Sequence, residues 1–466
     1  MTIEFAAPEY QADGSFRVTA YAFEGTSDQG WAVKREGRPH LALGPGYRLL
    51  RSAACGVCAT DLARRFLPFP LPQILGHEVL AVDDDGGRHV VEINASHATR
   101  GVDTPCPFCQ SCLAIHCPQR LVVGIHDLPG GFGPYLLAPV NAVFPVPDAI
   151  PSSSAVLIEP LAAALHAVTK VNPRDGDCIA VLGPRRLGML VLAALRAYRS
   201  TRQLKFKIMA LARRRELLDV AAEFGADTGL VVEGGGEGLP DGLADVVIDT
   251  TGTPEGFALA LRLARREVHL KSTHGRPAAG LQHLTQLVVD EIMIGRFEPQ
   301  DIADRTVAWL ASDPPPSEVA ARRLLCGEAA TLLAELEGMP AASGLPRADA
   351  VVVDSVEQID RAIRPRDGQA ASLVRPRGTV LVRPNADAQR ASALVEAVVD
   401  RGLTLTSSRC GDFKAALALM MGDPELGRVG DRLITHRFPA NRIAEAFETA
   451  ASPACLKAII EQDITV

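Results

Sequence analysis

The chain has 466 residues, of which 47% are apolar and 22% charged, and its formal net charge at pH 7 is −7. A chain of this length exceeds what one hydrophobic core usually serves, so we expect two or three domains. The negative charge offers no basic surface for nucleic acid, and no run reaches the roughly 18 uninterrupted apolar residues of a membrane helix. Because no basic segment followed by an apolar one opens the chain, we expect a cytoplasmic protein with neither nucleic acid nor membrane as partner.

The first 150 residues or so are rich in glycine and proline and contain short β-like runs, for example at 90–93 and 134–137. Turn-forming residues separate these runs. This pattern favours a mostly β, barrel-like domain.

From about residue 155 the pattern changes to alternating helices and strands. A helical stretch at 161–169 precedes a continuous apolar strand at 178–182, a glycine-containing turn and an apolar helix from Leu187 to about Tyr198. Further strand candidates, separated by helical stretches, lie at 207–211, 229–232, 245–249 and 268–270. This alternation predicts a doubly wound α/β domain with a parallel sheet.

Beyond residue 300, segments already described return in similar form. The run 244–249 is echoed by 348–354, and the run 288–290 by 398–400, at similar offsets along the chain. Buried strands of α/β proteins resemble one another in composition, so the sequence leaves open whether this is chance or a degenerate partial duplication. The run Ser312-Asp313-Pro314-Pro315-Pro316-Ser317 predicts a linker between the copies.

Three short runs carry groups suited to a catalytic zinc ion: Cys58-Ala59-Thr60-Asp61, Gly76-His77-Glu78 and Glu159-Pro160-Leu161. Catalytic zinc commonly takes three protein ligands and keeps one position open for substrate. Taken singly, Thr60 could cap a helix, Glu159 could favour a helix N-terminus, and His77 could be a core histidine. The occurrence of all three runs in this order favours the metal site.

Four cysteines fall within twelve residues, at Cys106, Cys109, Cys112 and Cys117. In a long chain of cytosolic character, such density favours a closed tetrahedral structural metal site over disulfides. His116 could substitute for Cys117 as a ligand.

The run from Gly183 to Gly188 lies between the first apolar strand and the following helix, where a dinucleotide-binding turn is expected. The first and third glycines of such a turn are present, but the middle position holds Arg185. Its side chain hinders close approach of the pyrophosphate to the backbone, although its charge could meet the pyrophosphate instead.

The second strand of the same domain runs into Arg213 and Arg214, with no carboxylate before Glu216. Enzymes that select NAD usually place an acid here to bind the ribose 2′-hydroxyl, whereas guanidinium groups suit a 2′-phosphate. The arginines could also be a solvated helix start. The sequence therefore favours NADP over NAD, with Arg213 as the first candidate for the phosphate contact.

The runs 55–61, 74–78 and 158–161 resemble the catalytic-zinc motifs of the zinc-dependent medium-chain dehydrogenases, the group of alcohol, sorbitol and threonine dehydrogenases. The resemblance implies Cys58, His77 and Glu159 as zinc ligands and Glu78 as a neighbour able to exchange on and off the metal. It also implies that Thr60 takes the proton from the substrate alcohol. Two departures stand out: Ala63 replaces a histidine that often continues this proton relay, and the last gap of the four-cysteine run is shorter than usual.

The resemblance covers residues from about 45 to 295 and resumes near Gly402. It implies a GroES-like β-barrel catalytic domain at 1–168 that is completed by 432–466. It also implies a Rossmann domain at 169–299 that ends with 379–431. The segment 300–378 is left as an insertion or a partly duplicated segment.

The implied function is a zinc-dependent oxidoreductase that transfers a hydride between a secondary alcohol or polyol, or the matching carbonyl, and NADP or NAD. The family also implies a homodimer or homotetramer in which the last strand of the nucleotide domain pairs across a twofold axis. Candidates for that strand are 292–294 and 403–406, and the second is favoured. The competing hypothesis is a zinc-binding, non-catalytic or regulatory relative with weakened nucleotide binding, which Arg185, Ala63 and the unmatched segment motivate.

Overall fold

The computed structural model describes residues 1–67, 69–272, 275–302, 305–311, 324–325, 348–364, 372–384 and 392–463. The chain divides into two compact units, Met1–Ala162 with Cys410–Val466, and Ala163–Arg409. From the sequence these divisions were expected at 168 and 432. The first division falls inside a continuous helix, α5 (Ile158–Val171), so no turn marks it in the sequence. The expected linker at 312–317, and much of the segment 300–378, lie outside the described residues.

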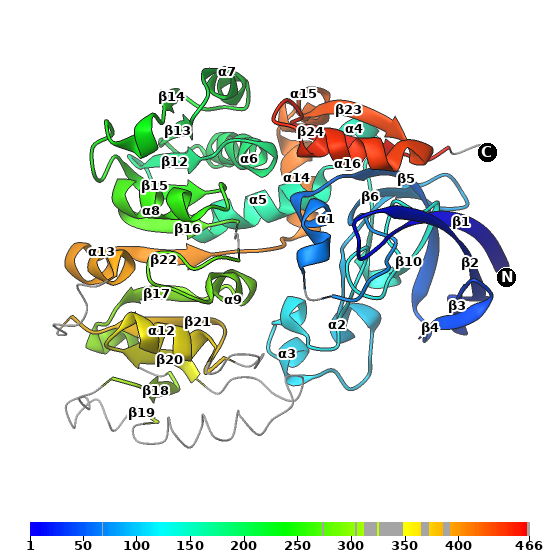
Figure 1. The fold of residues 1–466 in the computed structure, drawn as a ribbon, viewed down its shortest axis with the longest axis horizontal. Helices are drawn as coiled ribbons and strands as arrows, with labels where there is room; N and C mark the ends of the chain where they lie inside the picture. Colours follow the sequence, from blue (N-terminus) through cyan, green and yellow to red (C-terminus); the bar gives the residue numbers. More distant parts are fainter. Residues whose placement is uncertain are drawn as a thin grey trace. The chain divides into compact units, whose positions relative to one another are not determined.

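The first unit is built on antiparallel strands, and the C-terminal strands complete a sheet begun near the N-terminus (Figure 1). A four-stranded meander comprises β1 (Thr2–Tyr10), β2 (Phe16–Thr26), β3 (Gly30–Arg35) and β4 (Arg38–Leu43). A second sheet has the order β11-β7-β6-β5-β24-β23, with β10 also pairing with β5. Its strands are β5 (Tyr47–Gly56), β6 (Glu78–Val82), β7 (Arg88–Val91), β10 (Tyr135–Pro139), β11 (Val143–Pro145), β23 (Ile434–Pro439) and β24 (Lys457–Glu461).

Short helices lie between these strands and carry the polar residues of interest. They include α1 (Ala59–Leu62), α2 (His97–Arg100) and α3 (Pro107–Gln110). Buried side chains such as Phe23, Leu50 and Leu136 form one apolar cluster beneath them, which also takes in Phe438 and Ala446 from the C-terminal part. None of the helices in the described part of the chain has the length and apolar character needed to cross a membrane.

In the residues that the structure describes, the second unit is organised around an eleven-stranded sheet of order β14-β13-β12-β15-β16-β22-β17-β21-β20-β18-β19. The first six strands are mutually parallel and follow the strand order of a Rossmann domain. They are β12 (Cys178–Leu182), β13 (Lys207–Ala212), β14 (Thr228–Val231), β15 (Ala244–Asp249), β16 (Ala264–Leu270) and β22 (Thr404–Ser407). The doubly wound α/β fold that the sequence predicts is confirmed.

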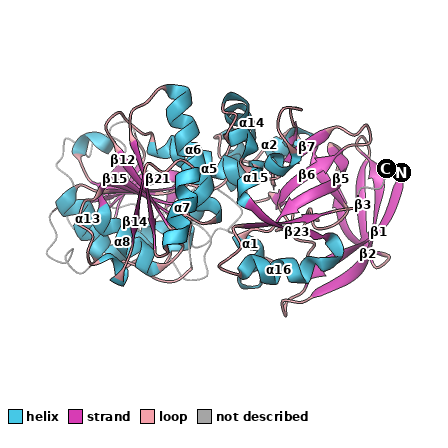
Figure 2. Cartoon of the chain, turned by 90° about the horizontal axis from the view of Figure 1, so that it is seen from above, coloured by secondary structure: helices cyan, strands magenta, loops and turns pink. Residues whose placement is uncertain are grey.

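Helices cover both faces of this sheet (Figure 2). The connecting helices are α6 (Arg186–Arg202), α7 (Arg215–Glu223), α8 (Pro254–Leu263), α9 (Leu284–Val289), α12 (Val356–Ile363) and α13 (Ala393–Arg401). Because strands buried on both faces favour apolar residues, β12 reads as a continuous apolar run in the sequence, and β15 is apolar except for Asp245 and Asp249.

The remaining five strands form a second parallel group, β17 (Met293–Arg296), β21 (Val374–Val382), β20 (Ala348–Val353), β18 (Val307–Trp309) and β19 (Leu324–Leu325). This group joins the first where β17 lies antiparallel to β22, with Ile294 opposite Leu405. The two strands considered for pairing across a twofold axis are therefore neighbours within one chain, and neither is a free edge. The expectation of a free edge failed because sequence patterns show which segments are strands, but not which distant strands lie side by side.

Candidate active site

Cys58, His77 and Glu78 bring a thiol, an imidazole and a carboxylate together, with ligand atoms within 4.8 Å of one another. Cys58 caps the short helix α1 directly after β5, while His77 and Glu78 lie at the start of β6, the neighbouring strand. Gly76 makes this entry into β6 possible: its φ is +95°, and a Cβ there would lie 2.7 Å from Cys55 Sγ. The local turn thus sets His77 opposite Cys58.

Asp61 supports this group, although no role was expected for it from the sequence. Its carboxylate is buried, accepts a hydrogen bond from the Cys58 backbone N–H at 2.8 Å and lies 3.4 Å from His77 Nδ1. A carboxylate beside one ring nitrogen orients the imidazole and leaves the other nitrogen for a metal. The signal was present in the sequence, since Asp61 follows Thr60 in the same run.

The charges of the group favour a cation. Burial by itself lowers the pKa of His77, but Asp61 and the Cys58 thiol outweigh it, so the pKa of His77 lies well above its usual value. The surroundings of the imidazole therefore stabilise positive charge, whether a proton or a metal ion supplies it.

Glu78 has a partner from the far end of the sequence. Its Oε2 forms a buried ion pair with Lys457 Nζ, which also donates to the Val57 carbonyl at 3.1 Å. Both side chains are almost fully buried. The ion pair occupies Oε2 and thereby restricts how Glu78 could approach a metal. Nothing in the sequence of either segment pointed to Lys457.

The other two residues of the expected site differ, since Thr60 contacts this group and Glu159 is not part of it. Glu159 lies in the first turn of α5 and is not among the side chains whose ligand atoms come within 4.8 Å. Thr60 lies on α1, with Oγ1 3.8 Å from Cys58 Sγ. Their roles as third ligand and proton acceptor stay predictions.

The cysteine-rich segment forms a second candidate metal group, with a composition that differs from the expected one. Its members are His97, Cys106, Cys109 and Cys117. Cys112 is exposed, has a left-handed backbone with φ of +59°, and lies outside the group. His97 comes well before the first cysteine, so spacing within the cysteine run could not identify it.

The geometry of this second group suits a metal ion better than a disulfide. Cys106 Sγ and Cys117 Sγ lie 3.7 Å apart, close to the separation of about 3.8 Å that tetrahedral zinc with bonds of about 2.3 Å imposes on two sulfurs. His97 Nε2 lies 2.7 Å from Gln119 Oε1, which fixes the ring proton on Nε2. The lone pair of Nδ1 then accepts the Cys106 N–H at 3.0 Å, and a metal ion bound at Nδ1 would have to replace this hydrogen bond.

The expected dinucleotide turn in the second unit packs so tightly against Thr250 and Thr251 that two of its positions leave no room for a side chain. Gly183 has φ of +82°, and a Cβ there would lie 2.7 Å from Thr251 Cγ2. A Cβ at Gly188, in the first turn of α6, would lie 2.8 Å from Thr250 Oγ1. Arg185 occupies the N-cap position of α6. In a dinucleotide-binding turn this is the place of the middle glycine.

Other groups gather at the same carboxyl edge of the sheet. Arg213 and Arg214 are exposed and follow directly after β13, where a ribose would lie in a Rossmann domain. Asp249, at the end of β15, is almost completely buried and accepts from the Thr251 N–H and hydroxyl. Burial raises the pKa of Asp249 to about 6 against these hydrogen bonds.

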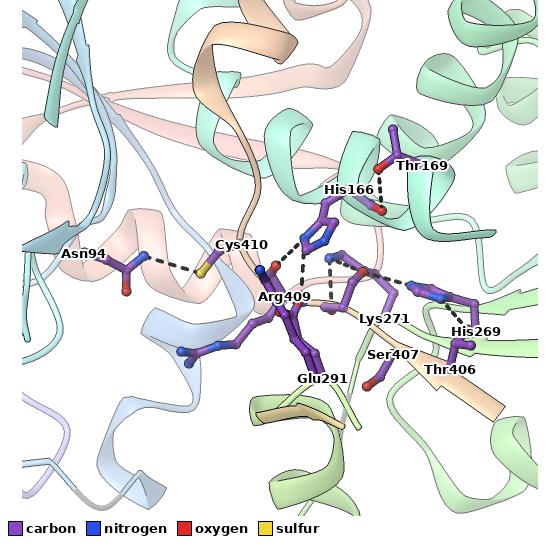
Figure 3. A network of polar contacts seen from close by, with 12 residues as sticks. Asn94, His166, Thr169, His269, Lys271, Glu291, Thr406, Ser407, Arg409 and Cys410 are labelled. Atoms are coloured by element: carbon purple, nitrogen blue, oxygen red, sulfur yellow. Dashed lines mark hydrogen bonds and ion pairs between the residues drawn. The ribbon is translucent and has the colours of Figure 1, made fainter. Parts of the chain in front are cut away.

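A chain of buried hydrogen bonds runs along the neighbouring strands β16 and β22 (Figure 3). Thr406 Oγ1 bonds Glu267 and lies 2.8 Å from His269 Nδ1, and His269 Nε2 lies 2.9 Å from Ser408 Oγ. Lys271 Nζ donates to Ser408 Oγ and O, both at 3.0 Å. Burial lowers the pKa of His269 far below its usual value and raises that of Glu267 to about 7. This network was not predicted, because it arises from the pairing of strands that lie far apart in the sequence.

Glu291 collects contacts from three other segments at the same edge (Figure 3). Its carboxylate accepts the Arg409 N–H at 3.1 Å and the Arg377 Nε–H at 2.7 Å, and lies 3.4 Å from His166 Nδ1. Because Glu291 is almost fully buried, these groups hold its charge in place.

Comparison with known proteins identifies relatives of this arrangement. Residues 44–148 match the model of the alcohol dehydrogenase GroES-like domain, which confirms that expectation. The chain is 28% identical to L-galactonate-5-dehydrogenase of Escherichia coli K12 over 237 residues, which cover 48% of this chain and 67% of that protein. It is 29% identical to L-threonine 3-dehydrogenase of Mesorhizobium japonicum over 164 residues, which cover 33% of this chain and 46% of that protein. The chain thus spans about half to two thirds of the length of these curated relatives.

A solved structure shares the fold over nearly the whole chain. It is a candidate zinc-binding dehydrogenase from Sinorhizobium meliloti in complex with NADP, with a TM-score of 0.56 and 19% identity. The alignment covers 98% of this chain and 99% of that one.

Proposed function

We propose that this chain, which belongs to the zinc-type medium-chain dehydrogenase family, transfers a hydride between a secondary alcohol or polyol, or the matching carbonyl, and a nicotinamide cofactor. The relatives support an oxidoreductase that acts on alcohols. The observation that carries the proposal is the group of the half-buried Cys58 with the buried His77 and Glu78, whose surroundings favour a cation.

The donor set fits zinc, which takes thiolate, imidazole and carboxylate ligands. Cys58 and His77 would hold the ion, with Glu159 as the third ligand and Glu78 beside it. A zinc ion there would act as a Lewis acid on the substrate oxygen. Asp61 fixes the orientation of His77 by its position next to Nδ1. The hydroxyl of Thr60, on the helix that Cys58 caps, would accept the proton of the substrate alcohol as it passes its own proton to water, since Ala63 offers no group to receive it.

The carboxyl edge of the second unit is the proposed nucleotide site. Gly183 and Gly188 let the turn and helix α6 pack closely against Thr250 and Thr251. Arg185 meets the pyrophosphate through its side chain. Arg213 and Arg214 favour the 2′-phosphate of NADP over the free hydroxyl of NAD.

The cysteine-rich segment is proposed as a structural metal site. Cys106, Cys109 and Cys117 supply thiolates, and His97 takes the place expected for Cys112. Four protein ligands close the coordination sphere, so such an ion contributes to folding rather than to catalysis.

Binding measurements on the purified protein test this proposal before any substrate is known. We expect two zinc ions per chain and tighter binding of NADP than of NAD. Replacement Arg213→Ala should weaken NADP binding about 10- to 100-fold, the equivalent of one charge-assisted contact, and leave NAD binding nearly unchanged. Arg202→Ala, at the distant end of α6, is the matched control.

The competing hypothesis of a non-catalytic zinc protein makes a different prediction. It retains support from Ala63 and Arg185, which depart from the family pattern at the proton relay and at the nucleotide turn. A chain that binds zinc but neither nucleotide would favour this second function and contradict the first.

A further inference from the structure

The second unit contains one arrangement of elements twice. The order β15, α8, β16, α9, β17 returns as β20, α12, β21, α13, β22. The N-caps also correspond, since Thr253 accepts the Gly256 N–H at the start of α8 and Ser355 accepts the Gln358 N–H at the start of α12.

Side-chain contacts repeat as closely as the elements do. In the first copy, Asp245 accepts the backbone N–H of Cys178 at 2.7 Å and the Arg265 Nε–H at 3.0 Å. In the second copy, Asp349 accepts the backbone N–H of Thr306 at 2.9 Å and the Arg375 Nε–H. Each aspartate lies near the start of its own strand, β15 or β20, and accepts one hydrogen bond from the segment on each side of that strand. Chance similarity of buried strands does not explain such matched polar contacts.

The two copies exchange their last strands. The strand that follows β16 in the arrangement is β17, yet β17 pairs with β21 of the second copy. The strand that follows β21 is β22, and it pairs with β16 of the first copy. Within the sheet, the copies meet where β22 and β17 run antiparallel, so each copy covers the sheet edge of the other. This is the arrangement of a symmetric dimer, made within one chain.

We propose that strands β17 to β21 form a degenerate second copy of the nucleotide-binding half, and that this copy takes the place of a partner subunit. The protein then functions as a monomer and binds one nucleotide per chain. The prediction of one nucleotide per chain depends on the proposed function. The prediction that no partner subunit is needed depends only on how the strands of the sheet pair.

At the carboxyl edge of the second copy, side chains occupy space where a nucleotide would bind. Arg383 and Lys271 occupy equivalent places, because their backbone N–H groups donate to the last residues of β20 and β15, at 2.9 and 3.0 Å. Arg383 forms a two-pronged ion pair with Asp354, at 2.7 and 2.8 Å, and its guanidinium lies over the ring of Trp309. In the first copy, the residue in register with Trp309 is the smaller Val181. A nucleotide at the second edge would have to displace both the ion pair and the indole ring.

The second copy also reaches the functional edge of the first. Arg377, on β21, donates its backbone N–H to Asp290 O at 2.7 Å and its side chain to the buried Glu291. A partner subunit would have to supply such a group across an interface. Here the same chain supplies it.

Mass and nucleotide stoichiometry of the wild-type protein test the proposal directly. We expect a concentration-independent mass of 49.5 kDa by light scattering at micromolar protein, and one NADP per chain by calorimetry. A dimer, or two nucleotides per chain, would overturn the proposal. Failure to bind any nucleotide would instead count against the proposed function, and the mass would still decide whether a partner is present.

A cross-link tests whether the junction lies within one chain. Ile294 and Leu405 face each other across antiparallel strands, at a separation that allows a disulfide. On mild oxidation, the double variant Ile294→Cys/Leu405→Cys should give a product of single-chain mass with that disulfide, and neither single variant should give it. A disulfide-linked pair of chains would overturn the proposal.

Discussion

His97 and Cys112 offer a direct comparison at the scale of single residues, because only one of them lies with Cys106, Cys109 and Cys117. We predict that His97→Ala lowers the metal content by one ion per chain and lowers the melting temperature, since a closed metal site contributes folding free energy. The exposed Cys112→Ala variant should match wild type in both respects. Cobalt replacement gives a second readout, because the charge-transfer absorption should indicate three thiolates.

The opposite pattern, with the metal lost on Cys112→Ala and retained on His97→Ala, would restore the four-cysteine assignment. Gln119→Leu is a useful intermediate. It removes the acceptor that fixes the His97 tautomer, so it should weaken the metal without removing a ligand.

Asp249 makes stability depend on pH in an unusual direction. Its pKa is about 6 in the folded protein, against an ordinary value of 3.8, so folding retains a proton that the unfolded chain releases. Stability from this group is complete below about pH 4 and decreases as the pH rises to 6, by about 3 kcal/mol in total. Asn at this position stays neutral and keeps an oxygen acceptor for Thr251.

We therefore predict that Asp249→Asn stabilises the protein at pH 7 and has little effect at pH 4. The measurement is the free energy of unfolding by urea at both pH values, with Asp84→Asn, an exposed position, as control. Equal effects of Asp249→Asn at the two pH values would show that Asp249 ionises normally in the fold. Glu267 and Glu92, with pKa values raised to about 7, are present in both proteins and cancel in the comparison.

At the scale of elements, β21 carries two arginines with different partners. The two arginine side chains are each about a third exposed, but Arg377 pairs with Glu291, whose side chain is fully buried, whereas Arg375 pairs with Asp349, whose side chain is about a third exposed. Removal of Arg377 takes a guanidinium partner away from the buried Glu291 carboxylate, so we expect Arg377→Met to cost about 2–4 kcal/mol. Arg375→Met should cost about 1 kcal/mol or less.

Unfolding free energies in urea would separate the two variants. The double variant Arg377→Met/Glu291→Gln should recover most of the loss, because the glutamine leaves no uncompensated charge. If both single variants lose the same stability, or the double variant loses more than Arg377→Met, the buried carboxylate is not what Arg377 stabilises.

The elements that the sequence predicted well are those whose own residues determine them. Strand β12 is apolar throughout, strand β15 is apolar except for Asp245 and Asp249, and Gly183 marks the turn after β12. Strand β17 and strand β22 were also seen as strands, but their mutual pairing depends on how the long segment between them folds. Local composition carries no information on that pairing, so the expectation of pairing across a twofold axis rested on the family resemblance alone.

The same distinction applies to the candidate site. Cys58, His77 and Glu78 were singled out because their residue types suit zinc and their short runs resemble a family motif, which needs no knowledge of tertiary structure. His97 and Lys457 were missed because each joins its group through tertiary structure: His97 through the packing of α2, and Lys457 through the pairing of β24 with β5. Glu159, expected beside Cys58 and His77, lies outside their group.

At the scale of the whole molecule, the two units combine a cation-binding group on antiparallel strands with a Rossmann edge. The internal second copy explains how such a chain can cover its sheet without a second subunit. It also explains why the chain is longer than a single catalytic domain plus a single nucleotide domain would require.

The central claim is that the group at Cys58 and His77 catalyses hydride transfer to a nicotinamide. The most direct measurement is the formation of NADPH by the zinc-loaded protein with a panel of secondary alcohols and polyols, for wild type, His77→Ala and the exposed control His40→Ala. We predict turnover with at least one polyol for wild type and the control, and none for His77→Ala, with all three proteins equally folded. Undiminished turnover in folded His77→Ala, or no oxidation of any alcohol by wild type that binds both zinc and NADP, would contradict the account.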